Sequence, residues 1–118
     1  KDIVIIDDMI SSGGSMLDPA RQLKEMGARR VFICTTFGLF TDGMDAFDDA
    51  YEKGWFDKVI TTNLTYQIPE LLSRPYYIEA DMSKFMASII DFMNHDVSLT
   101  TEKIRTILEK YNKRENYL

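Results

Sequence analysis

The sequence has one cysteine and fewer basic than acidic side chains. A single cysteine, Cys34, cannot form an internal disulfide, so a reducing, cytoplasmic location is the expectation. Cys34 stands in the apolar run VFIC, which predicts a buried, inert thiol. The 14 Lys and Arg residues against 19 Asp and Glu residues give a net charge of -5. This balance argues against a nucleic-acid partner or an anionic-membrane surface, because such surfaces need clustered positive charge.

Long apolar segments are also missing from the sequence. No run approaches the roughly 18 apolar residues that cross a bilayer, and no signal peptide opens the chain, so no membrane partner is expected. The 118 residues, 45% hydrophobic and 28% charged, fit one ordinary soluble domain with a single core. The chain begins at Lys1 and enters a strand-like run at once, so we expect an upstream part of the same protein to be missing.

Short apolar runs alternate with segments of helical period along the chain. The runs predict strands at 3–6, 31–35, 58–61 and 76–79, and the first two are apolar enough to be buried on both faces. Helices are predicted at 15–26, at 44–53, after Asp81 and at 98–115. This β-α-β-α order predicts an α/β fold with a parallel sheet, right-handed crossovers and helices on both faces.

The last two predicted helices are amphipathic. A Met-rich stripe after Asp81 recurs at helical spacing and predicts core packing. The final segment carries four apolar residues in helical register, Ile104, Ile107, Leu108 and Tyr111. We therefore expect residues 1–99 to form the main domain and residues 100–118 to form a helix packed on it.

The most informative stretch is IVIIDDMISSGGSM (3–16), where two acids and a Ser-Gly run follow an apolar strand. Ligands of open α/β sheets bind beyond the carboxyl ends of the strands, where Asp7 and Asp8 would lie. Adjacent carboxylates there need hydroxyl donors, a cation or both. Glycines allow positive φ and expose successive N–H groups, and the next helix points its positive end at the same place. Carboxylates that can accept hydrogen bonds from hydroxyls therefore lie next to backbone amides that can bind an anion. This combination predicts a sugar-phosphate site.

Three other kinds of segment share part of this pattern. A double acid after a strand also opens response-regulator receiver domains, where acids hold Mg²⁺ beside a phosphorylated Asp. Those domains need an acceptor Asp and a Lys at the ends of later strands, whereas the later runs here lead into TTFG and TNLT. A Walker loop needs a Lys that SSGGS lacks. A plain Ser-Gly turn without a ligand stays open.

The segment V-I-I-D-D-M-I-S-S-G-G-S (4–15) resembles the phosphoribosyl pyrophosphate motif of type I phosphoribosyltransferases. T-T-F-G-L-F (35–40), T-N-L (62–64) and the segment 81–95 resemble, in the same order, the closing segments of ribose-phosphate diphosphokinases. The resemblance covers about residues 3–99. It implies a Rossmann-like phosphoribosyltransferase fold, of which this chain would hold an incomplete part with about four strands and four helices.

The resemblance implies a role for each residue that matches the motif. Asp7 and Asp8 would bind the ribose 2- and 3-hydroxyls. The 5-phosphate would be held by backbone amides and hydroxyls of the loop residues Ser11, Ser12, Gly13, Gly14 and Ser15. The family moves the diphosphate of ATP onto ribose 5-phosphate, in nucleotide biosynthesis, with Mg²⁺ neutralising the transferred charge. Similar enzymes place their catalytic and ATP-contacting residues upstream and on a neighbouring subunit, which implies a homo-oligomer.

Two positions depart from the family pattern. Ser11 stands where the diphosphokinases usually have an Asp, and Phe37 replaces a His, although a buried ring there could simply pack under the next strand. We interpret residues 1–99 as the C-terminal, ribose-5-phosphate-binding part of a ribose-phosphate diphosphokinase. A nucleobase phosphoribosyltransferase, which shares the motif, remains an alternative. So does a non-catalytic regulator that binds phosphoribosyl ligands, which Ser11 keeps open.

The 118-residue chain alone is expected to make no phosphoribosyl pyrophosphate from ATP and ribose 5-phosphate with Mg²⁺ present. The reason is that the resemblance places half of the active site on upstream residues. A coupled assay for the product measures this directly. Appreciable turnover by the isolated chain would contradict this division of roles.

Overall fold

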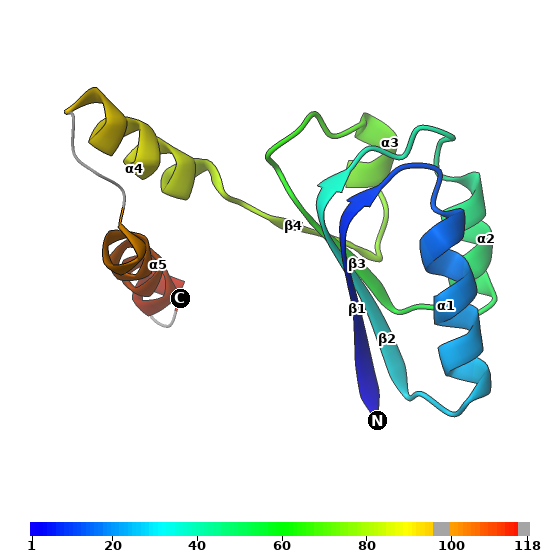
Figure 1. The fold of residues 1–118 in the computed structure, drawn as a ribbon. Coiled ribbons are helices and arrows are strands. Elements are labelled where there is room, and N and C mark those ends of the chain that lie inside the picture. Colours follow the sequence, from blue (N-terminus) through cyan, green and yellow to red (C-terminus); the bar gives the residue numbers. More distant parts are fainter. Residues whose placement is uncertain (96–99, 116–118) are drawn as a thin grey trace. The chain divides into compact units, whose positions relative to one another are not determined.

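The computed structural model describes residues 1–95 and 100–115, and Figure 1 shows the fold. Within these residues the elements follow the order β1 Asp2–Ile10, α1 Gly14–Glu25, β2 Arg30–Gly38, α2 Asp45–Glu52, β3 Lys58–Thr62, α3 Pro69–Leu72, β4 Tyr77–Ala80, α4 Ser83–Asn94 and α5 Thr101–Glu115. None of the helices in the described part of the chain is long and apolar enough to cross a membrane.

The chain divides into two compact units, Lys1–Asp81 and Met82–Leu118. The predicted division at residue 99, and the packing of residues 100–118 on the main domain, stay predictions. Residues 96–99 and 116–118 and the side chain of Tyr111 lie outside the described residues. In the second unit, Ile107 of α5 is buried, but α4 has no buried residue among those described. The core packing predicted for the Met-rich stripe is therefore not seen there.

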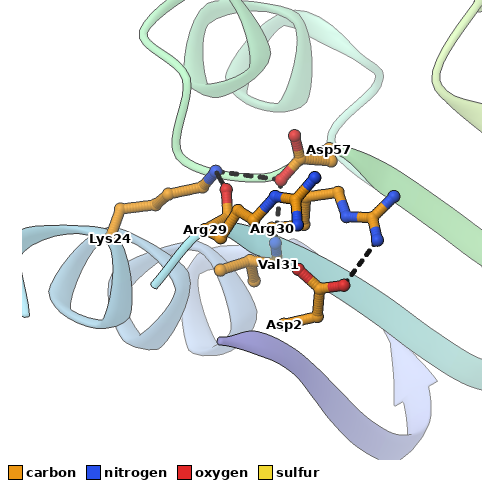
Figure 2. A network of polar contacts seen from close by, with 6 residues as sticks. All are labelled: Asp2, Lys24, Arg29, Arg30, Val31 and Asp57. Atoms are coloured by element: carbon orange, nitrogen blue, oxygen red, sulfur yellow. Dashed lines mark hydrogen bonds and ion pairs between the residues drawn. The ribbon is translucent and has the colours of Figure 1, made fainter. Parts of the chain in front are cut away.

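The four strands of the first unit form one parallel sheet in the order β1-β2-β3-β4. β1 pairs with β2 from Asp2↔Arg30 to Ile10↔Gly38, so the first two apolar runs are parallel neighbours. Across the first of these pairs, Arg30 Nη2 donates to Asp2 Oδ2 at 2.5 Å (Figure 2). A parallel sheet with intervening helices is the predicted α/β fold class, and this prediction is confirmed.

One face of the sheet holds the core of the first unit, beneath α1 and α2 (Figure 1). Alternate residues from 31 to 35 of β2, and two of β3, are buried on this face: Val31, Ile33, Thr35, Val59 and Thr61. The helices contribute buried side chains from one stripe each: Met16, Leu17 and Ala20 from α1, and Phe47 and Ala50 from α2. This alternation on strands and helical spacing on helices is what a two-layer core requires.

The opposite face of the sheet is open in the first unit. Val4 and Ile6 of β1 are 51% and 80% exposed, and Ile78 of β4 is 45% exposed. The prediction that the first two strands are buried on both faces is therefore wrong for β1, because α1 and α2 pack on one face. Cys34 lies on β2 and is half-buried rather than buried. Desolvation raises the pKa of its thiol, which makes it a weak nucleophile, as an inert thiol should be.

A polar network joins α1, β2 and the start of β3 at the amino edge of the sheet (Figure 2). Asp57 Oδ2 accepts the Val31 N–H at 2.8 Å, and the Asp57 N–H donates to the Val31 carbonyl at 2.8 Å. Lys24 Nζ lies 2.9 Å from the same Asp57 oxygen and donates to the Arg29 carbonyl at 2.9 Å. One carboxylate therefore fixes the end of α1 against the entry to two neighbouring strands.

Asp57→Asn is expected to lower the free energy of unfolding at neutral pH by about 1–2 kcal/mol, because a charged acceptor with two donors is lost from a carboxyl that solvent partly screens. Partial burial raises the pKa of Asp57, but the Val31 N–H and Lys24 outweigh it and the net pKa is lowered. A lowered folded-state pKa contributes stability above the unfolded pKa, and this stability is lost as pH falls through the folded pKa.

Urea unfolding at a series of pH values from neutral into the acid range measures this effect. The acid loss of stability should be shallower in Asp57→Asn than in the parent protein. Asp18→Asn is the control, because the Asp18 carboxyl is 70% exposed and lies 3.6 Å from Arg21, an ion-pair geometry that contributes little. Equal effects of the two substitutions would show that the network does not stabilise this corner.

Candidate functional site

The two acids of the motif lie within β1, close to its carboxyl end. The strand continues through Asp7 and Asp8 to Ile10, so the prediction that it ends at residue 6 is wrong. Asp7 pairs with Thr35, whereas the ladder has no pair at Asp8. The Asp8 N–H donates instead to Asp7 Oδ1 at 2.7 Å. A short acidic side chain that accepts a nearby backbone N–H competes with the strand ladder, and this interruption is local.

The interruption changes which way the side chains face. Residues 6–9 are exposed in succession and Ile10 is fully buried, so the alternation of the first half of β1 does not continue. In a regular strand, neighbouring side chains point to opposite faces. Both carboxylates nevertheless reach solvent, as a pair of ligand-binding acids must.

The Ser-Gly loop turns the chain from β1 into α1. Gly13 has φ +92° and is the N-cap residue of α1, and its carbonyl accepts the N–H groups of Met16 and Leu17 at 3.1 Å each. Gly14 begins the helix and does not have positive φ. The N–H groups of Gly14 and Ser15 belong to the first turn, where a helix has no backbone acceptor of its own. With no acidic side chain in this turn, the amino end of α1 suits an anion.

Two other segments support the loop. A Cβ atom at Gly13 would lie 2.2 Å from Cε2 of Phe47, so the buried ring of α2 lies directly against this backbone. The segment after β2 contributes Thr41, whose N–H donates to the Ser11 carbonyl at 3.0 Å. The loop is therefore held on two sides by residues that no motif in the sequence includes.

Threonines from β2 and β3 extend the polar edge beside Asp7. A cavity of about 260 Å³ opens here on the uncovered face of the sheet. Its lining is Ile6, Asp7, Cys34, Thr35, Thr36, Ile60, Thr61, Thr62 and Ala80. Thr62 Oγ1 donates to the Thr36 carbonyl, and the Thr61 and Tyr77 hydroxyls lie 2.7 Å apart. Sequence reasoning missed this lining, although a Thr-Thr pair after each of two apolar runs is a visible signal.

Phe37 lies at the same edge and is 38% exposed. Its partner in the register, Met9 of β1, is 43% exposed. The ring is therefore not buried under the next strand, an arrangement that the sequence left possible, because the two strands carry this pair where neither side chain is covered.

A metal ion would find few protein ligands at this edge. Across the described residues, no group of three or more His, Cys, Asp or Glu side chains is placed to hold a metal. Asn63 donates to Asp81 Oδ1 at 2.9 Å, so the acid that follows β4 is bonded to the loop after β3. In the part of the chain that the structure describes, Asp7 and Asp8 are the adjacent exposed carboxylates that precede the Ser-Gly loop. Two carboxylates suffice for Mg²⁺ when a substrate supplies phosphate oxygens.

Both the sequence and the fold of this chain match those of known proteins. Residues 1–103 match the family model of the phosphoribosyl synthetase-associated domain. The chain is 32% identical over 101 residues to a ribose-phosphate pyrophosphokinase of a Nostoc species, covering 86% of this chain and 29% of that protein. It is 33% identical over 100 residues to the ribose-phosphate pyrophosphokinase of Shewanella oneidensis, covering 85% of this chain and 31% of that protein.

A solved structure gives the same result for the fold. The crystal structure of phosphoribosylpyrophosphate synthetase from Mycobacterium smegmatis matches with a TM-score of 0.69 and 27% identity. The match covers 81% of this chain and 31% of that one. The chain thus spans less than a third of the length of these relatives.

Gly13→Ala and Gly14→Ala are expected to differ in their effect on stability. At Gly13 an alanine must hold φ near +92° and displace the Phe47 ring, so the free energy of unfolding should fall by about 1–3 kcal/mol. At Gly14 a Cβ meets no atom within 4 Å, so alanine should be neutral or stabilise by up to about 1 kcal/mol. Urea unfolding of both variants measures the difference. Equal losses would show that the Phe47 ring does not hold the loop at Gly13.

Proposed function

Because this chain belongs to the family of the phosphoribosyl synthetase-associated domain, we propose that it carries the ribose-5-phosphate site of a ribose-phosphate diphosphokinase. The relatives are named ribose-phosphate pyrophosphokinase or phosphoribosylpyrophosphate synthetase, which is the same activity. The observation that carries the proposal is the short connection of an exposed carboxylate pair to the amino end of α1 by a glycine loop.

The acids are suited to sugar hydroxyls. A carboxylate only accepts hydrogen bonds, and bonds from neutral donors to a charged acceptor are stronger than neutral ones. The Asp8 N–H holds Asp7 Oδ1 at 2.7 Å, which orients this carboxylate before a ligand arrives. Two adjacent carboxylates on exposed backbone match two adjacent hydroxyls, so we assign Asp7 and Asp8 to the ribose diol.

The loop is suited to the 5-phosphate. It offers the backbone N–H groups at the start of α1 and the hydroxyls of Ser11, Ser12 and Ser15. Gly13 and Gly14 have no side chain, so an anion can approach the backbone closely. These neutral donors lie at the positive end of the helix dipole. They hold the anion without a basic side chain.

In the proposed reaction, the diphosphate of ATP is transferred to the 1-hydroxyl of the bound sugar-phosphate. The part assigned to this chain is to hold and orient ribose 5-phosphate, which lowers the entropic cost of reaction. Asp7 and Asp8 would hold Mg²⁺ together with phosphate oxygens, and the ion would neutralise the charge of the transferred group. A cytoplasmic homo-oligomer is part of the same proposal and rests on the family resemblance and the single cysteine.

Asp8→Asn separates the two halves of this site. In the full-length protein it should weaken ribose 5-phosphate binding about 10- to 100-fold, because a charge-assisted hydrogen bond contributes about 1.5–3 kcal/mol. Affinity for inorganic phosphate should stay within about twofold, because the loop is unchanged. Calorimetric titration with each ligand measures both constants.

Asp18→Asn on α1 is the matched control and should alter neither constant, because Asp18 is exposed on a later turn of the same helix. If Asp8→Asn removes phosphate binding and leaves ribose 5-phosphate intact, the assignment of acids and loop is reversed. If the parent protein binds neither ligand, the proposed function fails.

A further inference from the structure

The segment between β2 and α2 forms a strained turn beside the glycine loop. Phe40 has φ +49° and is the sole non-glycine residue with positive φ in the described chain. For a bulky side chain this conformation is unfavourable and persists only where the surroundings impose it. The Phe40 ring is 3% exposed and packs edge-on against Phe47, with the ring centroids 5.0 Å apart. The Gly43 N–H closes the turn on the Phe40 carbonyl at 3.0 Å.

The turn brings Thr41 into contact with Ser11, the first residue of the Ser-Gly loop. The Thr41 N–H donates to the Ser11 carbonyl at 3.0 Å, and the two hydroxyl oxygens lie 3.5 Å apart. Both residues are exposed. An O–H···O hydrogen bond is usually about 2.7–2.8 Å long, so these hydroxyls bind each other weakly. Two hydroxyls at this spacing can instead both donate to an anion between them.

We propose that Thr41 is a second hydroxyl ligand of the phosphate group, donating beside Ser11. The inference rests on the proposed function, since the anion is the 5-phosphate of the sugar-phosphate. Thr41 comes from 30 residues further along the chain than Ser11 and lies outside the sequence motif. Residues 11–15 contain no basic side chain, so each additional neutral donor contributes a substantial share of phosphate affinity.

Thr41→Val tests the hydroxyl while keeping the shape of the side chain and the backbone N–H. In the full-length protein it should weaken binding of both inorganic phosphate and ribose 5-phosphate about 3- to 10-fold, as expected for one neutral hydrogen bond. Thr41→Ser keeps the hydroxyl and should stay within about twofold of the parent. Thr101→Val, at an exposed threonine of the second unit, is the control and should change neither constant.

The double variant Ser11→Ala/Thr41→Val distinguishes a ligand from a support. If both hydroxyls donate to the phosphate, the double variant should lose more affinity than Ser11→Ala alone, by a factor that need not equal the one measured for Thr41→Val because the two residues are in contact. Equal affinities of the double variant and Ser11→Ala would mean that Thr41 acts only through Ser11, which overturns the proposal. A loss in Thr41→Val that Thr41→Ser does not restore overturns it too.

The parent protein separates this inference from the proposed function. If the parent binds phosphate and ribose 5-phosphate and Thr41→Val binds both equally well, the role of Thr41 is wrong and the proposed function stands. If the parent binds neither, the proposed function fails and the role of Thr41 fails with it. Thermal unfolding without ligand, expected to be unchanged in Thr41→Val, confirms that the variant is folded.

Discussion

The position of the Phe47 ring is the constraint on which the candidate site depends. The ring is fully buried, packs against Phe40 at 5.0 Å and Phe56 at 6.0 Å, and lies where a Cβ atom of Gly13 would be. It therefore connects the core of the first unit to both segments that approach the proposed phosphate. Because interiors are close-packed, a shift of this ring would move the glycine loop and the Phe40 turn together. The packing of the core, rather than contacts within the loop, therefore fixes the geometry of the candidate site.

The amino edge of the sheet is held by polar contacts within the protein, whereas the carboxyl edge presents polar groups to solvent. At the amino edge, Asp57, Lys24 and Val31 satisfy one another and join α1 to two strands. At the carboxyl edge, Asp7 and Asp8 are exposed, and the strand ladder to β2 is interrupted at Asp8. Parallel sheets place ligand sites at the carboxyl edge because the loops there can vary without loss of the core. A firmly bonded amino edge allows the other edge to keep carboxylates exposed to a ligand.

Local patterns in the sequence predict the positions of most strands and helices well, but they do not predict which segments cover each face of the sheet. The alternation of apolar runs with helical segments predicts the parallel order, and Gly27 and Gly54, with φ +96° and +76°, lie just after α1 and α2 as helix-ending glycines should. The apolar residues of β1 also suggested burial on both faces, but apolarity does not say which segment covers a face, and Ile6 is 80% exposed. The short helix α3 was not predicted, although Pro69 at its first position is a known signal for a helix start.

The same limit applies to the candidate site, because part of it comes from a segment distant in the sequence. Sequence reasoning predicted Asp7, Asp8 and the Ser-Gly loop, because their chemistry is encoded in consecutive residues. It did not predict the role of Thr41, because that residue is placed by a backbone conformation that Phe40 would avoid without tertiary contacts. Neutral donors bind an anion tightly only when they are held in place beforehand, since each freely rotating hydroxyl loses entropy on binding. The proposed phosphate site, which has no basic side chain in a chain of net charge -5, would therefore depend on the rigidity that the buried Phe47 ring provides.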